Sequence, residues 1–566
     1  MKKILRSFVM TALLLSMAQL GSAKDKAPAA AEETDGRKPV IVISIAGYDN
    51  VMGDIGYIGR LAQMPELEKL AEGIIASQTK AKGLEGLDTK RPWGVVVSTD
   101  GFGFQPLAFL PVTDLKKLLD ATSGLIGPAE QKENGILELA AKNPRVYLKE
   151  KNGWVFIAQS PENLANVPAN PLQLLGGLDK QYEVALKFYI HNIPDAFRSL
   201  AIDYLKNVSQ TLPVDENEDE AAAEKRKEYM EKQTKAMADL INTVDQFTLG
   251  WALDQKANTS HLDTTLTALP NSTLAKKLNA LKETTSNYTG FMLPKAAVVL
   301  NSSQTLLVDD IEQAAQAIDM FQTTLSREIE NSPDLTDDDS RAAAKRIVTE
   351  AGDAIKATIK TGKIDFGGSW ILGDRKFNLV LGAYVSEPGE LEKALKDLVA
   401  VAAKDPNFPA VKFDVATQGE VRFHTWTSPV PADDKVNRAI GKELKVAVGF
   451  GPQSVYFGVG TDDPLVLIKK AIDASKTGTS TKVPPGVVDV ALQPILDFAS
   501  VLKPDDENVA AVLAEVAKTP GKDHIHLEIK PQQNGVSYRL ELQEGVLKAL
   551  GLTTKIQIDK QNAAAE

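Results

Sequence analysis

The clearest pattern of hydrophobic and polar positions along the chain lies between Leu444 and Ser475. Apolar residues occupy every second position of two short runs there, which predicts two strands with one buried face each. Gly451 and Pro452 separate the runs and are typical of a tight turn. The alternating apolar positions are Leu444, Val446, Val448, Phe450, Val455, Phe457 and Val459.

A helix is predicted directly after this hairpin. Asp462 or Asp463 can accept hydrogen bonds from the first N–H groups of a helix, and Pro464 suits its first position. At helical spacing, one apolar stripe is formed by Leu465, Ile468 and Ile472. The stretch therefore predicts a β-hairpin followed by a helix, a ββα unit.

Four stretches of the chain share one order of predicted elements. Each has a strand, a helix, a turn with a proline and acidic residues, a second helix, a hairpin and a third helix. The strands begin near residues 40, 182, 295 and 487, and the turn prolines are Pro65, Pro213, Pro333 and Pro504. Further strand-like sequence follows the first and third stretches, at 144–167 and 411–426. Self-similarity of this order indicates duplication.

The chain is therefore predicted to contain two tandem halves, 40–290 and 295–551. Hairpins that alternate with helices favour antiparallel pairing, with the helices gathered on one face. The predicted fold class is α+β, with duplicated antiparallel sheets built from β-hairpin–helix (ββα) units and long helical hairpins. The two long helix pairs, 197–244 and 308–361, either project as arms for a partner protein or cover a sheet face, and we favour covering.

Both ends of the chain are predicted to lie outside these halves. Residues 1–23 combine a basic start, an apolar core and small residues before the end, which is typical of a signal peptide cleaved after Ala23. A flexible leader is predicted over 24–39 and a polar, frayed tail over 552–566. No other run is apolar and long enough to cross a bilayer. We therefore expect an exported protein, periplasmic or extracellular, with no transmembrane segment in the mature chain.

Composition narrows the classes of partner. The formal net charge is −11, and cleavage of the predicted signal peptide would make it more negative, because residues 1–23 contain three positive charges. An acidic surface disfavours polyanions, so we expect no nucleic-acid partner. Cysteine is absent, which leaves neither disulfides nor a thiol nucleophile, and no G-x-S-x-G elbow is present. No cofactor is predicted.

His524 and His526 are the candidate metal ligands of the sequence. They alternate along a predicted strand, so their imidazoles share one face, and two such ligands can begin a zinc or iron site. The pattern identifies no third ligand, because the other histidines are scattered at His191, His261 and His424. A solvated or interfacial sheet face is the favoured interpretation of the pair.

Three other patterns resemble known sites and are better explained by structure. Four spaced glycines lack the tight G-x-G-x-x-G arrangement that dinucleotides need, and they favour a glycine-faced helix packed close to a sheet. Acidic clusters at 215–220 and 334–339 imitate a calcium loop, but 215–226 has Glu220 and Arg226 where glycine and glutamate belong, so helix capping is favoured. Tryptophans near predicted strands are more typical of core than of a ligand groove. The glycines are Gly47, Gly53, Gly56 and Gly59, and the tryptophans are Trp93, Trp154, Trp251, Trp370 and Trp426.

Several stretches, including IAGYDNVMGDIGYIGRLAQMPELEKL and IHNIPDAFR, resemble a family of uncharacterised exported proteins from planctomycete bacteria. The similarity is clearest between Ile45 and Arg198. That family has no established activity, so the resemblance implies export and a shared architecture and adds no site residue.

The favoured hypothesis is an exported, non-enzymatic binding or scaffold protein whose sheets present a groove or face to a protein or an apolar ligand. A metal-dependent hydrolase with His524 and His526 as ligands is the first alternative. A structural component of the cell envelope, with no ligand, is the second. Oligomeric state and the identity of any ligand stay open.

Overall fold

The computed structural model describes residues 36–79, 83–139, 145–210, 220–331, 338–403, 408–430, 433–478 and 482–565. The predicted signal peptide and most of the predicted leader lie outside these residues. The chain forms two compact units. The N-terminal unit comprises the described residues of Ala23–Leu278, with Gln532–Arg539 and Leu550–Glu566, and the C-terminal unit comprises Asn279–Pro531 and Leu540–Ala549.

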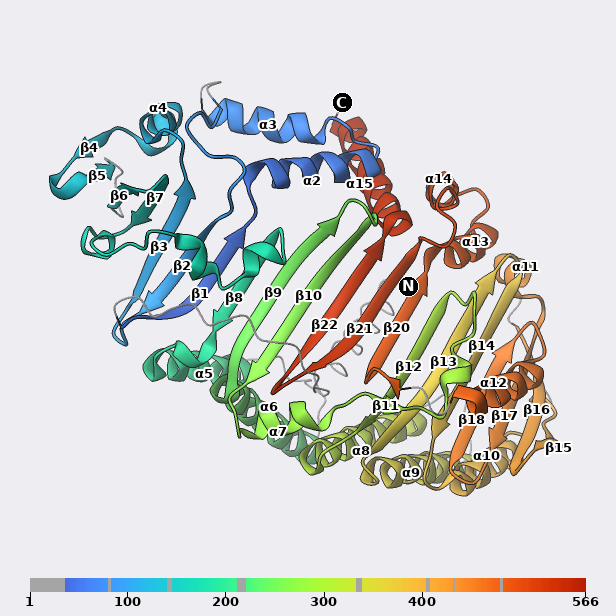
Figure 1. Ribbon diagram of the computed structural model, residues 1–566. Helices are drawn as coiled ribbons and strands as arrows, with labels where there is room; N and C mark the ends of the chain where they lie inside the picture. Colours follow the sequence, from blue (N-terminus) through green and yellow to red (C-terminus); the bar gives the residue numbers. More distant parts are fainter. Residues whose placement is uncertain are drawn as a thin grey trace. The chain divides into compact units, whose positions relative to one another are not determined.

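The N-terminal unit is built on an antiparallel sheet (Figure 1). Its strands pair in the order β4–β5–β6–β7–β3–β2–β1–β8–β9–β10, and every pairing is antiparallel. The strands are β1 (Lys38–Ile45), β2 (Trp93–Thr99), β3 (Phe104–Pro111), β4 (Ala129–Gln131), β5 (Ile136–Leu139), β6 (Val146–Lys151), β7 (Trp154–Ala158), β8 (Val184–Tyr189), β9 (Val244–Asp254) and β10 (Thr259–Ala268).

The helices of this unit connect its strands. They are α2 (Tyr48–Leu61), α3 (Leu67–Gln78), α4 (Leu115–Ile126), α5 (Asp195–Gln210), α6 (Glu220–Thr243) and α7 (Thr273–Ala280). Helix α2 contacts α3, and α5 contacts α6. Side chains alternate across β7, so that Phe156 joins a core with Phe109 and Leu175, whereas Val155 packs with Leu118 of α4. Both faces of the sheet are therefore buried at β7.

The C-terminal unit also contains a large antiparallel sheet. Its strands pair in the order β15–β16–β17–β18–β14–β13–β12–β20–β21, so that β12 pairs with β13 and β20, as β1 pairs with β2 and β8. The strands are β12 (Val298–Thr305), β13 (Lys363–Gly373), β14 (Lys376–Tyr384), β15 (Lys412–Gln418), β16 (Val421–Pro429), β17 (Glu443–Phe450), β18 (Ser454–Gly460), β20 (Gly486–Ala491) and β21 (His524–Gln532). The next strand, β22 (Gly535–Gln543), begins in a segment of the N-terminal unit and ends in the C-terminal unit. A separate two-stranded sheet pairs β11 (Thr284–Thr285) with β19 (Lys482–Val483).

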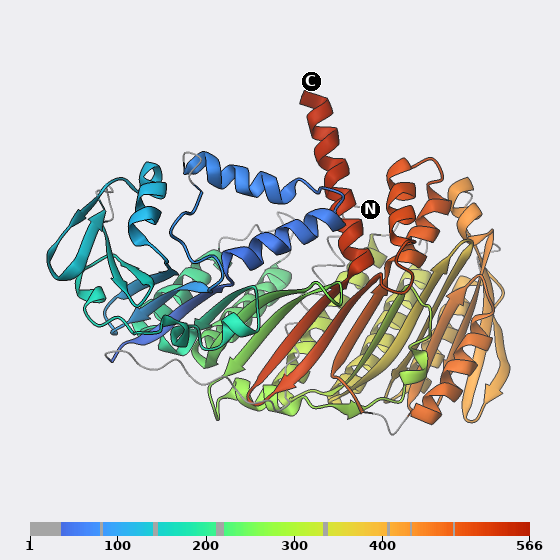
Figure 2. The ribbon, with the colours of Figure 1, turned by 45° about the horizontal axis from the view of Figure 1, so that its top comes forward.

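Helices lie on both faces of this sheet (Figures 1 and 2). Helix α9 contacts α8, α10 and β13, whereas α12 packs against β14, β17 and β18. Within the 308–361 pair, α9 contacts both its partner helix α8 and the strand β13. The helices are α8 (Val308–Glu330), α9 (Asp338–Lys360), α10 (Pro388–Ala402), α11 (Asp434–Ile440), α12 (Pro464–Gly478), α13 (Leu492–Leu502) and α14 (Glu507–Val516). The last helix, α15 (Glu544–Ala565), begins in the C-terminal unit and belongs to the N-terminal unit from Leu550 onward.

The stretch 444–475 folds as the predicted hairpin and helix, with one difference. Asp463 accepts the N–H of Leu465 at 3.0 Å, and Ile468 and Ile472 of α12 are buried. However, β17 is buried at every position from Val446 to Phe450, so the prediction of a single buried face is wrong there. The reason is tertiary: α10 and α12 both contact β17, and an alternating pattern cannot report a second covering layer.

The chain ends differ from the predicted boundaries. Strand β1 begins at Lys38, so the last residues assigned to the leader belong to a strand. Helix α15 continues to Ala565, where a frayed tail from 552 was predicted. Gly551 lies so close to Ala62 that a Cβ atom there would fall 2.3 Å from Ala62 Cα, which explains the glycine.

The mixed α and β class and the antiparallel pairing of the strands are confirmed, as is the absence of cysteine. None of the helices in the described part of the chain combines the length and apolarity that crossing a bilayer requires.

Candidate functional site

The two predicted histidines, His524 and His526, both contact Asp489, which the sequence pattern did not identify. His524 and His526 lie on β21, and Asp489 lies on the neighbouring strand β20, in register with His526. His524 Nδ1 is 2.5 Å from Asp489 Oδ1, and His526 Nδ1 is 3.2 Å from Asp489 Oδ2. In the sequence, Asp489 stands out only as an acidic residue inside the mostly apolar run VVDVALQ.

This arrangement orients two rings but does not assemble three ligands around one point. The carboxylate engages both Nδ1 atoms, and each Nε2 takes no part in these contacts. Among the described residues, a group of three potential ligand atoms within 4.8 Å of one another occurs instead at Glu392, Asp414 and His424.

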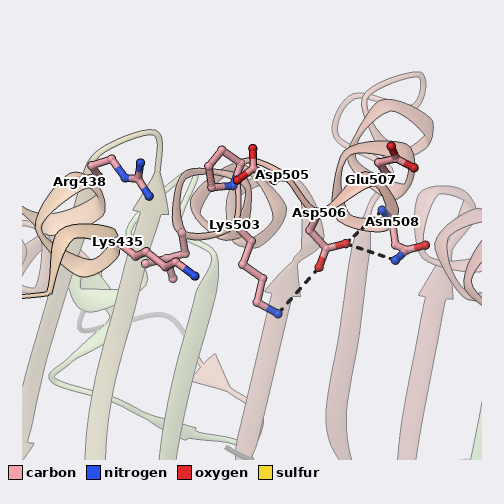
Figure 3. A pocket seen from close by; sticks show the side chains of 9 residues that line it. Lys435, Arg438, Lys503, Asp505, Asp506, Glu507 and Asn508 are labelled. Atoms are coloured by element: carbon pink, nitrogen blue, oxygen red, sulfur yellow. Dashed lines mark hydrogen bonds and ion pairs between the residues drawn. The ribbon is translucent and has the colours of Figure 1, made fainter.

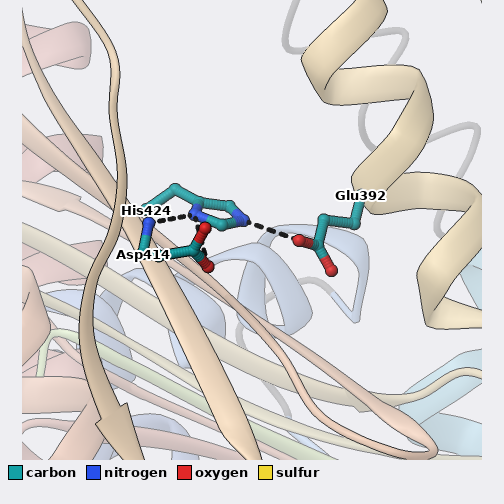
Figure 4. Close-up of side chains that lie close together, drawn as sticks. All are labelled: Glu392, Asp414 and His424. Carbon is teal, nitrogen blue, oxygen red and sulfur yellow. Dashed lines mark hydrogen bonds and ion pairs between the residues drawn. The ribbon is translucent and has the colours of Figure 1, made fainter.

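That second cluster lies in the C-terminal unit, between α10 and the strands β15 and β16 (Figure 4). His424 is buried, and its Nδ1 accepts the backbone N–H of Asp414 at 2.9 Å. Its Nε2 lies 3.3 Å from Glu392 Oε1. Because Nδ1 accepts, the neutral ring carries its proton on Nε2 and donates it to the carboxylate. The tautomer is thereby fixed.

Two cations complete the surroundings of Glu392. Lys396 Nζ lies 2.7 Å from Oε1, and an Arg422 nitrogen lies 2.5 Å from Oε2. Burial alone would raise the pKa of Glu392, but the hydrogen bonds and charges of Lys396 and Arg422 outweigh it and lower the pKa to about 2. A metal ion would have to displace these cations, so the cluster is an ion-pair network that stabilises the packing of α10 on β16.

A third group of carboxylates, in contrast to Glu392, is surrounded mainly by other acids. In the N-terminal unit, α2, the residues before β8 and the end of β9 surround a cavity of about 620 Å³. The charged residues that line it are Asp49, Asp54, Glu183, Asp254, Lys256 and His261. Acids therefore outnumber bases around this cavity, which we call the acidic cavity.

Asp54 is buried at the acidic cavity, and Glu183 beside it is half-buried. Asp54 is only 4% exposed, and its Oδ1 accepts from Gln255 Nε2 at 2.8 Å. Asp54 Oδ2 and Glu183 Oε2 are buried without a hydrogen-bond partner among the described residues. Burial raises the pKa of Asp54, against the hydrogen bond from Gln255. Burial, and then the charge of Asp54, raise the pKa of Glu183.

The glycines of α2 are explained by packing, although not the packing that was predicted. A Cβ atom at Gly56 would fall 2.2 Å from Glu68 Oε2, and one at Gly59 would fall 2.7 Å from Met64 O. The glycine face of α2 therefore meets α3 and the turn before it, rather than a sheet. The spacing of these glycines is visible in the sequence, whereas no pattern distinguishes Asp54 between them.

A further cavity, of about 560 Å³, lies beside α11 and the turn between α13 and α14 (Figure 3). Asp506 Oδ1 accepts the N–H groups of Asn508 and Val509 at 3.1 and 3.2 Å, and Lys503 lies 4.0 Å from Oδ2. The acids of this turn thus begin α14, as predicted for Pro504–Glu507. Basic and acidic side chains both line this cavity. Its residue Asp506 is explained by its role as the N-cap of α14.

The remaining predicted positions have structural surroundings. Most of the acidic clusters 215–220 and 334–339 lies outside the described residues, and Asp338 and Asp339 stand in the first turn of α9. Trp154 is buried in the core of the N-terminal unit, whereas Trp370 is partly exposed.

Comparison with known proteins adds no assignment: no family model, no curated protein and no solved structure matches the chain.

Proposed function

We propose that this is an exported, non-enzymatic binding or scaffold protein that contacts an apolar segment of a partner protein. The observation that carries the proposal is Phe102, which is 94% exposed at the tip of the turn between β2 and β3. With other exposed apolar residues of the N-terminal unit it forms what we call the aromatic patch. The patch comprises Phe102, Phe104, Phe197, Leu200 and Tyr204.

The turn holds Phe102 outward. Asp100 Oδ1 accepts the N–H groups of Phe102 and Gly103 at 3.0 and 3.2 Å, and Asp100 Oδ2 accepts from Gln105 at 2.9 Å. Gly101 supplies the positive φ, 99°, that the turn requires. A preorganised loop loses little conformational entropy on binding, so a fixed aromatic at its tip favours recognition.

Helix α5 extends the patch. The rings of Phe104 and Phe197 lie 4.8 Å apart between their centroids, which links the turn to the helix. Phe197, Leu200 and Tyr204 follow one another at helical spacing and share one face of α5. Soluble proteins seldom expose contiguous apolar surface of this kind unless it binds something. Central aromatic residues also dominate the binding energy of protein interfaces.

The test compares the patch with another exposed aromatic residue, on a different helix. We expect Phe102→Ser combined with Tyr204→Ser to reduce at least tenfold the amount of partner that co-purifies from the native host, measured by quantitative mass spectrometry. Phe321→Ser, at a 60% exposed position of α8, is the matched control and should retain the partner. Equal recovery with both variants, at unchanged circular dichroism, would reject the patch as the binding face.

A metal-dependent enzyme is the second candidate, and Asp489 is the observation that favours it. A carboxylate that holds the Nδ1 atoms of His524 and His526 resembles the outer-shell partner of metal-bound histidines. Elemental analysis of the purified protein is the test. Stoichiometric zinc or iron that disappears on changing both histidines to Ala supports this candidate, and its absence removes it.

The same proposal includes an origin by duplication and export. Corresponding strand pairings in the two units, and one order of strand, two helices and hairpin in 40–290 and 295–551, support duplication of ββα-containing halves. The basic and apolar pattern of residues 1–23, and the resemblance to exported planctomycete proteins, support export to the periplasm or beyond.

A further inference from the structure

The acidic cavity is lined by two acids that each have a buried oxygen with no hydrogen-bond partner in the described part of the chain. Most buried carboxylates in proteins are hydrogen-bonded or paired, because burying an unpaired charge is strongly unfavourable. Asp54 Oδ2 and Glu183 Oε2 depart from this rule together, and both residues line the same cavity. The charge of Asp54 also acts on Glu183, so the two carboxyl groups are electrostatically coupled. A second negative charge nearby makes the ionised form of each carboxyl group less favourable.

We propose that the acidic cavity binds a divalent hard cation, with Asp54 and Glu183 as its anionic ligands. The cation would neutralise the buried carboxylate of Asp54 and the half-buried one of Glu183, and would bond the two buried oxygens that have no partner among the described residues. This site is independent of the aromatic patch and of the histidines on β21.

The other lining groups favour a metal ion over an organic ammonium group. Asn50, Gln181 and Gln255 bring amide groups to the cavity, and carbonyl and carboxylate oxygens are the ligands that Ca²⁺ prefers. Sites for organic ammonium ions are commonly walled by aromatic rings, whereas the apolar lining of this cavity consists of Gly53, Ala252 and Leu253.

Several elements of the fold hold the two carboxylates in place. Gln255 fixes the other oxygen of Asp54, which leaves Oδ2 for a ligand. The backbone of Glu183 is tied on both sides, because its N–H donates to Trp251 O at 2.9 Å and its carbonyl accepts from Ala46 at 2.8 Å. Ligand groups anchored on a helix and between strands are preorganised for binding.

Calcium titration of the full-length protein, after treatment with a chelator, tests the proposal. We expect Ca²⁺ to raise the thermal midpoint and to give a saturable signal by isothermal titration calorimetry. Asp54→Asn and Glu183→Gln should each weaken binding at least tenfold. The exposed Asp120→Asn on α4 is the matched control for the loss of one charge and should bind like the wild type.

Terbium luminescence gives a second measurement that does not depend on stability. Tb³⁺ replaces Ca²⁺ in oxygen-ligand sites, and Trp251 directly precedes Ala252 of the cavity lining, so tryptophan excitation should sensitise its emission. The signal should fall at least tenfold in Asp54→Asn. Three outcomes would overturn the proposal: no saturable binding of Ca²⁺ or Tb³⁺, equal binding by Asp54→Asn and Glu183→Gln, or saturable binding of propylammonium alone.

Discussion

Two buried acids of this protein, Glu392 and Asp54, are equally hidden and have opposite surroundings. Each is 4% exposed and extends from a helix. Lys396, Arg422 and His424 bond the two oxygens of Glu392, whereas Asp54 has one amide partner and one oxygen with no partner among the described residues. Burial alone therefore does not distinguish a carboxylate held in an ion-pair network from one with an oxygen left for a ligand. The hydrogen-bond and ion-pair partners of each oxygen make that distinction.

The pKa directions express the same contrast. The pKa of Glu392 falls to about 2 because cations outweigh burial, while the pKa values of Asp54 and Glu183 rise because burial is opposed by little. Folding stabilises the ionised form of the first group and destabilises the ionised forms of the other two.

The largest expected effect comes from Glu392→Ala, which would leave His424 and two cations without their carboxylate. Breaking a fully buried ion pair costs ~3–5 kcal/mol, and we expect about 2 kcal/mol here because Lys396 and Arg422 are half exposed. The shift in the urea midpoint measures it, with the exposed Glu390→Ala of the same helix as control. A loss equal to that of Glu390→Ala would contradict the network.

The pH dependence of stability should separate the two sites by sign. Glu392 titrates at about 2 in the folded protein and near its ordinary 4.5 in the unfolded chain, so its contribution is complete above 4.5 and lost as pH falls toward 2. Asp54 and Glu183 have raised folded pKa values, so their contribution is present below their unfolded values, 3.8 and 4.5, and lost as pH rises through the folded values.

Urea unfolding over a pH series measures both the loss of stability at acid pH, the acid limb, and the decline at higher pH. Glu392→Gln should flatten the acid limb and leave the decline at higher pH unchanged, whereas Asp54→Asn combined with Glu183→Gln should do the reverse. Identical pH profiles for the two variants would show that the contrast between the sites is wrong.

A smaller effect, of opposite sign to that of Glu392→Ala, is expected from Asp54→Asn. Without added cation, removal of the unpaired charge should stabilise the protein at pH 7, because burial disfavours the ionised form of Asp54. Asn keeps an oxygen to accept from Gln255. The urea midpoint at pH 7 in chelator measures this change, and a destabilisation above that of Asp120→Asn would contradict it.

The smallest effect concerns Asp506, a half-buried acid that accepts two backbone N–H groups at the start of α14. Asp506→Ala should destabilise α14 by about 1 kcal/mol or less, because it removes one N-cap. Asp506→Asn retains a capping oxygen and should restore most of that loss. Thermal unfolding of both variants measures the difference, and identical midpoints would show that this turn is not held by its cap.

The sequence predicted what depends on neighbouring residues. The hairpin over β17 and β18, the cap of α12 at Asp463 and the acids that begin α14 follow from local periodicity and capping chemistry. Burial of both faces of β17 depends on two helices distant in sequence, and no alternating pattern encodes it.

The candidate sites were less predictable because their members come from separate elements. The alternation of His524 and His526 was visible, but Asp489 lies 35 residues before His524 and pairs through the sheet. His424 was grouped with the scattered histidines, since Glu392 lies 32 residues away. Asp54 and Glu183 are 129 positions apart, and only the fold brings both to one cavity.

A crystal of the full chain grown with Ca²⁺ and then soaked in Tb³⁺ tests the central contrast most directly. The anomalous difference map should contain a strong peak bonded to Asp54 and Glu183 and no peak at the Glu392–His424 cluster. A peak at Glu392, or no peak beside Asp54 at full occupancy of other sites, would contradict the view that partnerless buried oxygens mark the ligand site of this protein.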